Sequence, residues 1–139
     1  MLSTDEINVL THEVIGRAIA VHREMGPGLL ENVYEECLAY ELKDANLRFY
    51  RQRPVSLRYK GVELKSELKL DLLIEDKLIL ELKSVQELVP LFDAQVLTYL
   101  KLTNISVGLL INFNVPVLKN GVKRLIRPRL QETTETKDL

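Results

Sequence analysis

The sequence predicts one α/β domain in which helices flank a mixed β-sheet. Two segments near its start have helical periodicity, while the middle of the chain alternates polar and apolar residues as strands do. Residues 105–113 are almost entirely apolar (Ile-Ser-Val-Gly-Leu-Leu-Ile-Asn-Phe), which is typical of a strand that helices bury on both faces. A length of 139 residues suits one domain with a substantial core.

The two N-terminal helices are expected over residues 3–25 and 29–45, because apolar side chains recur there every three or four positions. Residues 26–28 (Gly-Pro-Gly) end the first helix and turn the chain. Glu31 falls in the first turn of the second helix, where an acid suits the helix dipole. The functional alternative is that Glu31 points inward, toward a charged hairpin further along the chain.

Strands are expected after the second helix. Residues 48–54 mix arginines with aromatic side chains and are predicted to form an edge strand that Pro54 ends. Residues 55–59 alternate between polar and apolar side chains and are expected to form a strand. A turn then connects this strand to a longer strand over residues 62–74.

The last third of the chain adds a third helix and two strands. Pro90 suits the first turn of a helix that runs to about Leu102. The apolar strand follows this helix, and residues 122–126 form a last strand. The domain is predicted to span residues 1–130, and residues 131–139 are a polar tail that is expected to be flexible.

The central feature is a β-hairpin over residues 70–85, whose apolar runs are interrupted by Asp71, Glu81 and Lys83. Glu81 and Lys83 are two apart, so they share a face of their strand. A two-residue loop would place Asp71 opposite Leu80, with Glu81 on the other face. A three-residue loop or a bulge places Asp71 opposite Glu81. We predict this second register, because bulges beside sites often re-aim a side chain.

Two carboxylates and one lysine on one face suit a hard divalent cation. Mg²⁺ prefers oxygen ligands, keeps several waters and often takes only one or two carboxylates. The lysine would position or deprotonate an attacking water, or stabilise charge on a phosphate. The structural alternative is a salt bridge between carboxylate and lysine across two strands of a solvated sheet face.

The net charge of −1 conceals an uneven distribution of charge. Residues 43–69 contain eight cations and three acids, and residues 119–129 contain five cations and no acid. Such regions permit phosphate binding without a basic protein overall, although solvated strand edges would explain them equally. The candidate contacts to nucleic acid are Arg51, Arg53, Arg58, Lys60, Lys123 and Arg124.

Cysteine content and hydropathy exclude other classes of protein. The single cysteine, Cys37, excludes an internal disulfide and a cysteine-ligated iron–sulfur cluster. Neither a signal peptide nor a long apolar span is present, so we expect a cytoplasmic protein without membrane contact.

Three motifs occur in the order expected of one family. Residues 28–34 (Gly-Leu-Leu-Glu-Asn-Val-Tyr) match the Gly-x-x-Glu-x-x-Tyr signature for which the GxxExxY protein family is named. Asp71 followed by residues 81–83 (Glu-Leu-Lys) matches the Asp…Glu-x-Lys core of the PD-(D/E)xK nuclease superfamily. Gln95 and Tyr99 match the Gln-x-x-x-Tyr element of its RecB-like branch. The chain resembles these proteins over roughly residues 13–128.

The resemblance implies a restriction-endonuclease-like fold and a set of roles. Asp71 and Glu81 would hold Mg²⁺ or Mn²⁺, with the backbone carbonyl of Leu82 as a third ligand. Lys83 would position the attacking water, and Glu31 would support the metal or its waters. Gln95 and Tyr99 would orient Lys83 or the phosphate.

The expected function is therefore divalent-metal-dependent hydrolysis of phosphodiester bonds, in DNA, by one chain or a homodimer. The alternative is a non-catalytic module that keeps the fold and binds nucleic acid or a protein partner. A third possibility is an unrelated structural role.

Overall fold

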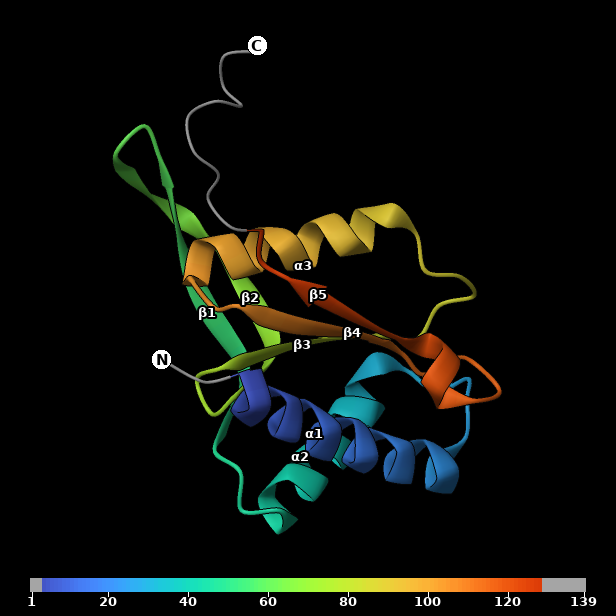
Figure 1. Cartoon of the computed structure of the whole chain (residues 1–139). Coiled ribbons are helices and arrows are strands. Elements are labelled where there is room, and N and C mark those ends of the chain that lie inside the picture. Colours follow the sequence, from blue (N-terminus) through green and yellow to red (C-terminus); the bar gives the residue numbers. More distant parts are fainter. Residues whose placement is uncertain (1–3, 129–139) are drawn as a thin grey trace.

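The computed structural model describes residues 4–128, in which α1 and α2 lie on one face of a five-stranded sheet and α3 lies on the other (Figure 1). The elements in chain order are α1 (Thr4–Met25), α2 (Glu31–Asp44), β1 (Phe49–Tyr59), β2 (Val62–Ile74), β3 (Leu78–Lys83), α3 (Pro90–Thr103), β4 (Val107–Asn112), the 3-10 helix η1 (Leu118–Gly121) and β5 (Val122–Ile126). The predicted tail over residues 131–139 lies outside the described residues.

The sheet is mixed, as the sequence predicts. Its strand order is β1-β2-β3-β4-β5, and only β3 and β4 pair in parallel. Helix α3 connects these two parallel strands across one face, as parallel neighbours require a crossover. The α/β fold with helices on both faces of a central mixed sheet is thereby confirmed.

Successive side chains of the central strands point to opposite faces of the sheet, which divides the core into two layers. Leu80 and Leu82 of β3 face α1 and α2, whereas Ile79 faces α3. All six residues of β4 are buried, because helices cover both faces of that strand. Two helical layers therefore enclose β3, the strand that carries Glu81 and Lys83.

The register of the central hairpin is the predicted one. The pairs nearest the loop are Ile74 with Leu78 and Leu72 with Leu80, which leaves a three-residue loop over residues 75–77. Glu75 and Asp76 adopt positive φ angles of 54° and 55°, as tight hairpin turns need. One residue beyond the pair of Leu72 with Leu80, Asp71 falls opposite Glu81.

The prediction that Pro54 ends a strand is wrong. Strand β1 continues through Pro54 to Tyr59, and Pro54 pairs with Lys69 of β2. Because β1 is an edge strand, the backbone nitrogen of Pro54 can lie on the solvent side of the strand. The N–H group that proline lacks then costs no backbone hydrogen bond to a neighbouring strand.

The distal part of the β1–β2 hairpin, residues 53–70, projects beyond the sheet and is called the arm here (Figure 1). One face of the arm is apolar: Val55 contacts the α3 side of the core, while Tyr59 and Val62 near the tip are 62% and 63% exposed. The other face carries charged side chains, with Arg58 opposite Glu63. The arm is thus an amphipathic ribbon that starts beside Asp71.

Candidate functional site

Asp71 and Glu81 lie where β2 and β3 separate. The backbone pairing of the two strands ends at Leu72 and Leu80, and carboxylates make the next contacts between them. The backbone N–H of Leu82 donates to Oδ2 of Asp71 at 2.8 Å, and the N–H of Asp71 donates to Oε1 of Glu81 at 3.4 Å. The fork between the strands is therefore occupied by two acidic side chains.

Glu81 is only 6% exposed, which is rare for a carboxylate without a cation beside it. Burial, and after it the negative charge of Asp71, together raise the pKa of Glu81 from 4.5 to about 9, and Lys83 opposes this shift only weakly. Among the described residues no salt bridge joins Lys83 to either acid, so the expected alternative of a cross-strand ion pair is not observed. Two adjacent acids that cannot both ionise easily form a site that favours a bound cation.

Lys83 ends β3 on the face that α3 covers. Its ammonium nitrogen lies 4.4 Å from the ring centroid of Phe92, in the first turn of α3. The segment after Lys83 is fixed as well, because the side-chain amide of Asn112 bonds both backbone groups of Val85, at 3.0 and 3.1 Å. The hydroxyl of Ser84 donates to the carbonyl of Leu29 at 2.5 Å. These contacts restrict where the lysine can point.

The carbonyl of Leu82 faces the same fork. Successive residues of a strand direct their backbone groups to opposite neighbours. The Lys83 carbonyl accepts a hydrogen bond from Phe113, on the side of β4, so the Leu82 carbonyl lies on the side of β2. Leu82 therefore presents its carbonyl oxygen on the side where its N–H meets Asp71.

The tyrosine of the Gly-x-x-Glu-x-x-Tyr motif stabilises the loop before α2. The Tyr34 hydroxyl donates to the carbonyl of Gly26 at 2.6 Å and accepts from the N–H of Leu29 at 3.1 Å. Its buried ring stacks on Phe113, with centroids 4.3 Å apart. Glu31 of the same motif is exposed and has no hydrogen bond or ion pair among the described residues, so its metal-supporting role stays a prediction.

The two α3 residues differ in their surroundings. Tyr99 is partly buried, and its pKa is raised first by burial and then by the negative charges of Glu81 and Asp71. This effect places Tyr99 in the electrostatic field of the two acids. Gln95 is exposed and makes no hydrogen bond among the described residues, so its orienting role stays a prediction.

Two polar residues that the sequence analysis did not select connect α2 to this site. Glu35 is 8% exposed and accepts hydrogen bonds from Arg51 at 3.0 Å and from the side-chain amide of Gln52 at 2.6 Å. The same amide nitrogen lies 3.3 Å from Oδ1 of Asp71. One feature of the sequence could have indicated Glu35: it follows Glu31 by four residues and so lies on the same face of α2.

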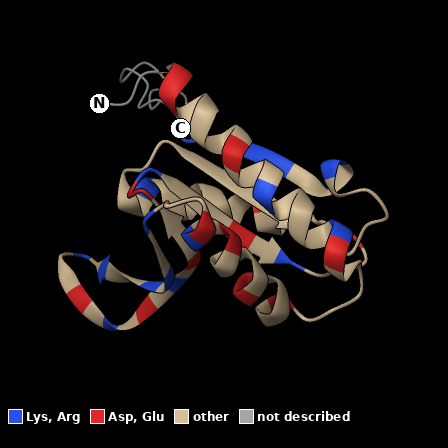
Figure 2. Cartoon of the chain, turned by 90° about the horizontal axis from the view of Figure 1, so that it is seen from below, with Lys and Arg blue, Asp and Glu red and all other residues tan. Residues whose placement is uncertain are grey.

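The candidate nucleic-acid contacts do not form one patch. Arg51 and Arg53 belong to β1 near the base of the arm, and Arg58 and Lys60 lie toward the tip of the arm. Lys123 and Arg124 lie on β5, at the other edge of the sheet. Figure 2 shows cations and acids interspersed along the arm. Lys123 bonds Asp93 at 2.9 Å, whereas Arg124 is exposed.

The donor set suits a hard cation although it is small. Among residues 4–128 no group of three or more His, Cys, Asp or Glu side chains converges as a metal site. The fork offers two carboxylates and one carbonyl oxygen, and this is enough for Mg²⁺, which often binds one or two carboxylates and retains its waters.

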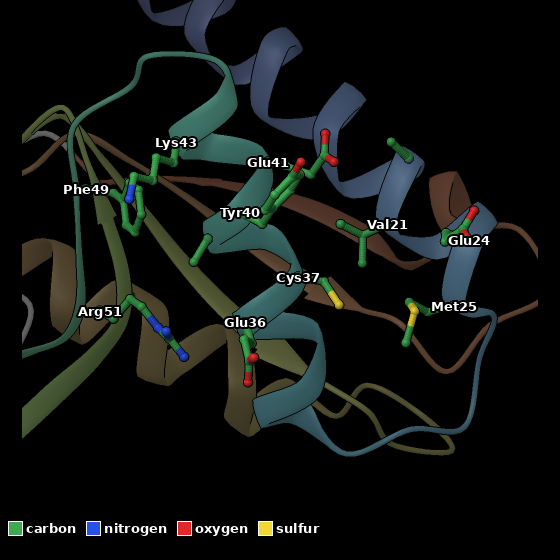
Figure 3. Close-up of a pocket in the computed structure, with 12 residues that line it drawn as sticks. Val21, Glu24, Met25, Glu36, Cys37, Tyr40, Glu41, Lys43, Phe49 and Arg51 are labelled. Carbon is green, nitrogen blue, oxygen red and sulfur yellow. The ribbon is translucent and has the colours of Figure 1, made fainter.

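A groove of about 710 Å³ lies elsewhere, between α1, α2 and the start of β1 (Figure 3). Apolar side chains such as Val21, Met25 and Cys37 form much of its lining. The groove includes none of the residues of the fork.

The chain belongs to the PD-(D/E)XK nuclease superfamily, because residues 8–125 match the model of that superfamily. Among solved structures, the crystal structure of SSO0001 is similar, with a TM-score of 0.50 and 19% sequence identity. The match covers 76% of this chain and 54% of that chain, so this chain spans about half of the other protein's length. This likeness shows the fold alone.

No match was found among curated proteins. In residues 4–128, no helix combines the length and the apolar character that crossing a bilayer requires.

Proposed function

We propose that this chain is a divalent-metal-dependent nuclease that hydrolyses phosphodiester bonds in DNA. Within its superfamily we assign it to the GxxExxY family and the RecB-like branch, on the three ordered motifs described above. The observation that carries the proposal is the close approach of Asp71 to a buried Glu81 at the fork of β2 and β3. A pair of acids held there without an ammonium partner suits a catalytic cation better than a structural salt bridge.

In this proposal Asp71, Glu81 and the Leu82 carbonyl hold Mg²⁺ or Mn²⁺. The bound ion would supply an activated water and stabilise negative charge on the phosphate. Lys83 lies two residues after Glu81, and its ammonium would hold the attacking water or a phosphate oxygen. Glu31 would support the ion through its waters.

Two residues of α3 complete the proposed machinery. Tyr99, whose pKa is raised by burial and by the charges of the two acids, would orient Lys83 or the phosphate through a hydrogen bond from its hydroxyl. Gln95 lies one helical turn before Tyr99 and would contact the phosphate from the solvent side.

Nucleic acid would approach along the arm, which begins beside Asp71 and so forms one wall of the fork. Arg53 lies over the ring of Tyr50 at 4.4 Å, and Lys60 lies 5.4 Å from the ring centroid of Tyr59. Such pairs of a cation and an aromatic ring can bind phosphates and stack on bases. The two cations of β5 would contact more distant phosphates. A homodimer would present two arms to one DNA molecule.

Incubation with single- and double-stranded DNA in Mn²⁺ tests the proposal. Wild-type protein should cleave, and Lys83→Ala should lose roughly 10²–10⁴-fold in rate while still binding Mn²⁺. Lys77→Ala is the matched control, because Lys77 is an exposed lysine in the loop of the same hairpin. Equal cleavage by wild type and Lys83→Ala would reveal a contaminating nuclease and remove the support for the proposal.

The second candidate is a module that binds nucleic acid or a protein without turnover. The exposure of Gln95 and Glu31 favours it, since neither residue is held toward the acids. Retained DNA binding without cleavage in Mg²⁺ or Mn²⁺ would support this candidate.

A further inference from the structure

We propose that Gln52 is a positioning residue for Asp71 and that Glu35 of α2 anchors it. The inference rests on the proposed metal site and adds two residues to it. Neither residue belongs to the Asp…Glu-x-Lys, Gly-x-x-Glu-x-x-Tyr or Gln-x-x-x-Tyr motif.

The side-chain amide of Gln52 joins two carboxylates from different elements. Its nitrogen lies 2.6 Å from Oε1 of Glu35 and 3.3 Å from Oδ1 of Asp71. A primary amide has two N–H groups, so one nitrogen can donate to both acids at once. The two bonds fix the rotation of the amide and connect α2 to Asp71.

Glu35 is a firm anchor because it is held from two directions. Its Oε2 accepts a hydrogen bond from Nε of Arg51 at 3.0 Å, which compensates the burial of the carboxylate. Its Oε1 remains for Gln52. Arg51 alone would pair the charge of Glu35, so the Gln52 bond is not needed to neutralise that carboxylate.

The backbone of Gln52 is also unusual. Its φ angle is 50°, in the left-handed region that non-glycine residues seldom adopt. Gln52 lies between the pairs Arg51–Leu72 and Arg53–Leu70, and it therefore faces Asp71 on the neighbouring strand. Strained conformations of this kind concentrate at functional sites, where the geometry of a side chain matters more than local strain.

The result for Asp71 is a carboxylate restrained at both oxygens. Gln52 donates to Oδ1, and the N–H of Leu82 donates to Oδ2. Each carboxylate oxygen has a second lone pair, so both remain able to bind a cation. Partners of this kind fix the direction of a metal ligand, and their loss typically weakens metal affinity or activity about 10–100-fold.

Isothermal titration of the full chain with Mn²⁺ tests the inference, beside thermal unfolding of the metal-free protein. Gln52→Ala should weaken Mn²⁺ binding by about 10-fold or more. Gln52→Gly should do the same without strain at a positive φ, which glycine adopts freely. Asp71→Ala is the reference for a lost ligand.

The anchor is tested by Glu35→Gln against Glu36→Gln. Glu36 is the next residue of α2, but it is exposed and makes no bond to Gln52. We expect Glu35→Gln to weaken Mn²⁺ binding and Glu36→Gln to leave it unchanged.

If Gln52 has a purely structural role, its replacement will lower the unfolding temperature but leave the Mn²⁺ affinity of the folded protein within about 2-fold of wild type. That result would overturn the inference, while the proposed function would stand. No Mn²⁺ uptake by wild type would overturn both. If Gln52→Ala fails to fold, the Gln52→Gly titration decides alone.

Discussion

Glu81 lies beside Asp71 with its carboxylate withdrawn from solvent, and the Asp71 N–H points at it across 3.4 Å. The two acids come from neighbouring antiparallel strands and lie one residue beyond the last backbone pair of these strands. In the metal-free protein, burial and the negative charge of Asp71 favour the protonated form of Glu81, and in the proposed enzyme a divalent cation replaces that proton.

The stability of the metal-free protein should fall as the pH rises from about 5 to 9. The folded state raises the pKa of Glu81 to about 9 from 4.5, so folded Glu81 holds a proton that unfolded Glu81 releases within this interval. The stabilisation is complete below the unfolded pKa and is lost as the pH approaches the folded pKa, by up to about 1.4 kcal/mol per pH unit. Chemical denaturation at pH 5.5, 7 and 8.5 measures this slope.

Glu81→Gln supplies the control for this experiment, because a neutral amide of the same shape has no proton to lose. The variant should flatten the slope, and the exposed Glu67→Gln should preserve it. A wild-type slope equal to that of Glu81→Gln would contradict the pKa shift.

Binding of Mn²⁺ should release close to one proton at pH 7. The cation and the proton compete for the same pair of carboxylates, and Glu81 is protonated at this pH. Titration calorimetry in two buffers of different ionisation enthalpy counts the protons released. Binding without proton release would indicate a site that does not include Glu81.

Replacement of Phe92 should slow cleavage with little effect on Mn²⁺ affinity. The ring lies under the Lys83 ammonium, and a cation over an aromatic face is held by about 0.5–2 kcal/mol. Phe92→Leu keeps an apolar side chain and removes that attraction, so we expect a rate lowered roughly 2- to 30-fold. The exposed neighbour Leu91 provides the control, since Leu91→Ala should cleave at the wild-type rate.

Removal of two cations from the arm should reduce the salt dependence of DNA binding. Arg58 and Lys60 lie near the arm tip, and each phosphate contact contributes about 0.7–0.9 to the slope of log K against log salt concentration. We expect the double replacement by serine to lower the slope by about 1.5 in fluorescence-anisotropy titrations. Lys119→Ser is the control, because η1 lies at the opposite end of the molecule from the arm (Figure 1). An unchanged slope in the double variant would exclude the arm from the contact surface.

Two glycines should respond to alanine with opposite signs. Gly16 is exposed within α1, and an added methyl group would meet nothing within 4 Å, so Gly16→Ala should stabilise by about 0.5–1 kcal/mol. At Gly121 the same methyl group would overlap the carbonyl oxygen of Asn112, so Gly121→Ala should destabilise by roughly 1–3 kcal/mol. Urea denaturation of both variants checks the signs.

The sequence predicted much of this architecture, because the architecture follows from the periodicity of apolar side chains and from a few charged residues within apolar strands. The interruptions at Asp71 and Glu81 predicted the hairpin register, which the pairing of Leu72 with Leu80 confirms. The apolar run over 105–113 predicted a buried strand, observed as β4, Val107–Asn112.

What the sequence did not predict depends on tertiary geometry. Gln52 reaches Asp71 only through the pairing of β1 with β2 and an unusual φ angle, and neither leaves a local signature. The sequence also does not show that Glu35 is buried, because a charged residue inside an amphipathic helix is ordinarily solvated. The wrong prediction at Pro54 has a similar origin. A proline interrupts the pairing of a strand where the position of its missing N–H group faces a neighbouring strand, and this depends on the tertiary structure.

The same proline bears on how copies of this chain can associate. An eleven-residue edge strand is normally an open template for another strand, yet β1 lacks a donor at Pro54 and is distorted at Gln52. Addition of a strand at β1 is therefore discouraged, which leaves the five-residue β5 as the other edge strand of the sheet within residues 4–128. Because the arm extends from β1 and β2, an association of two chains at β5 would leave both arms uncovered.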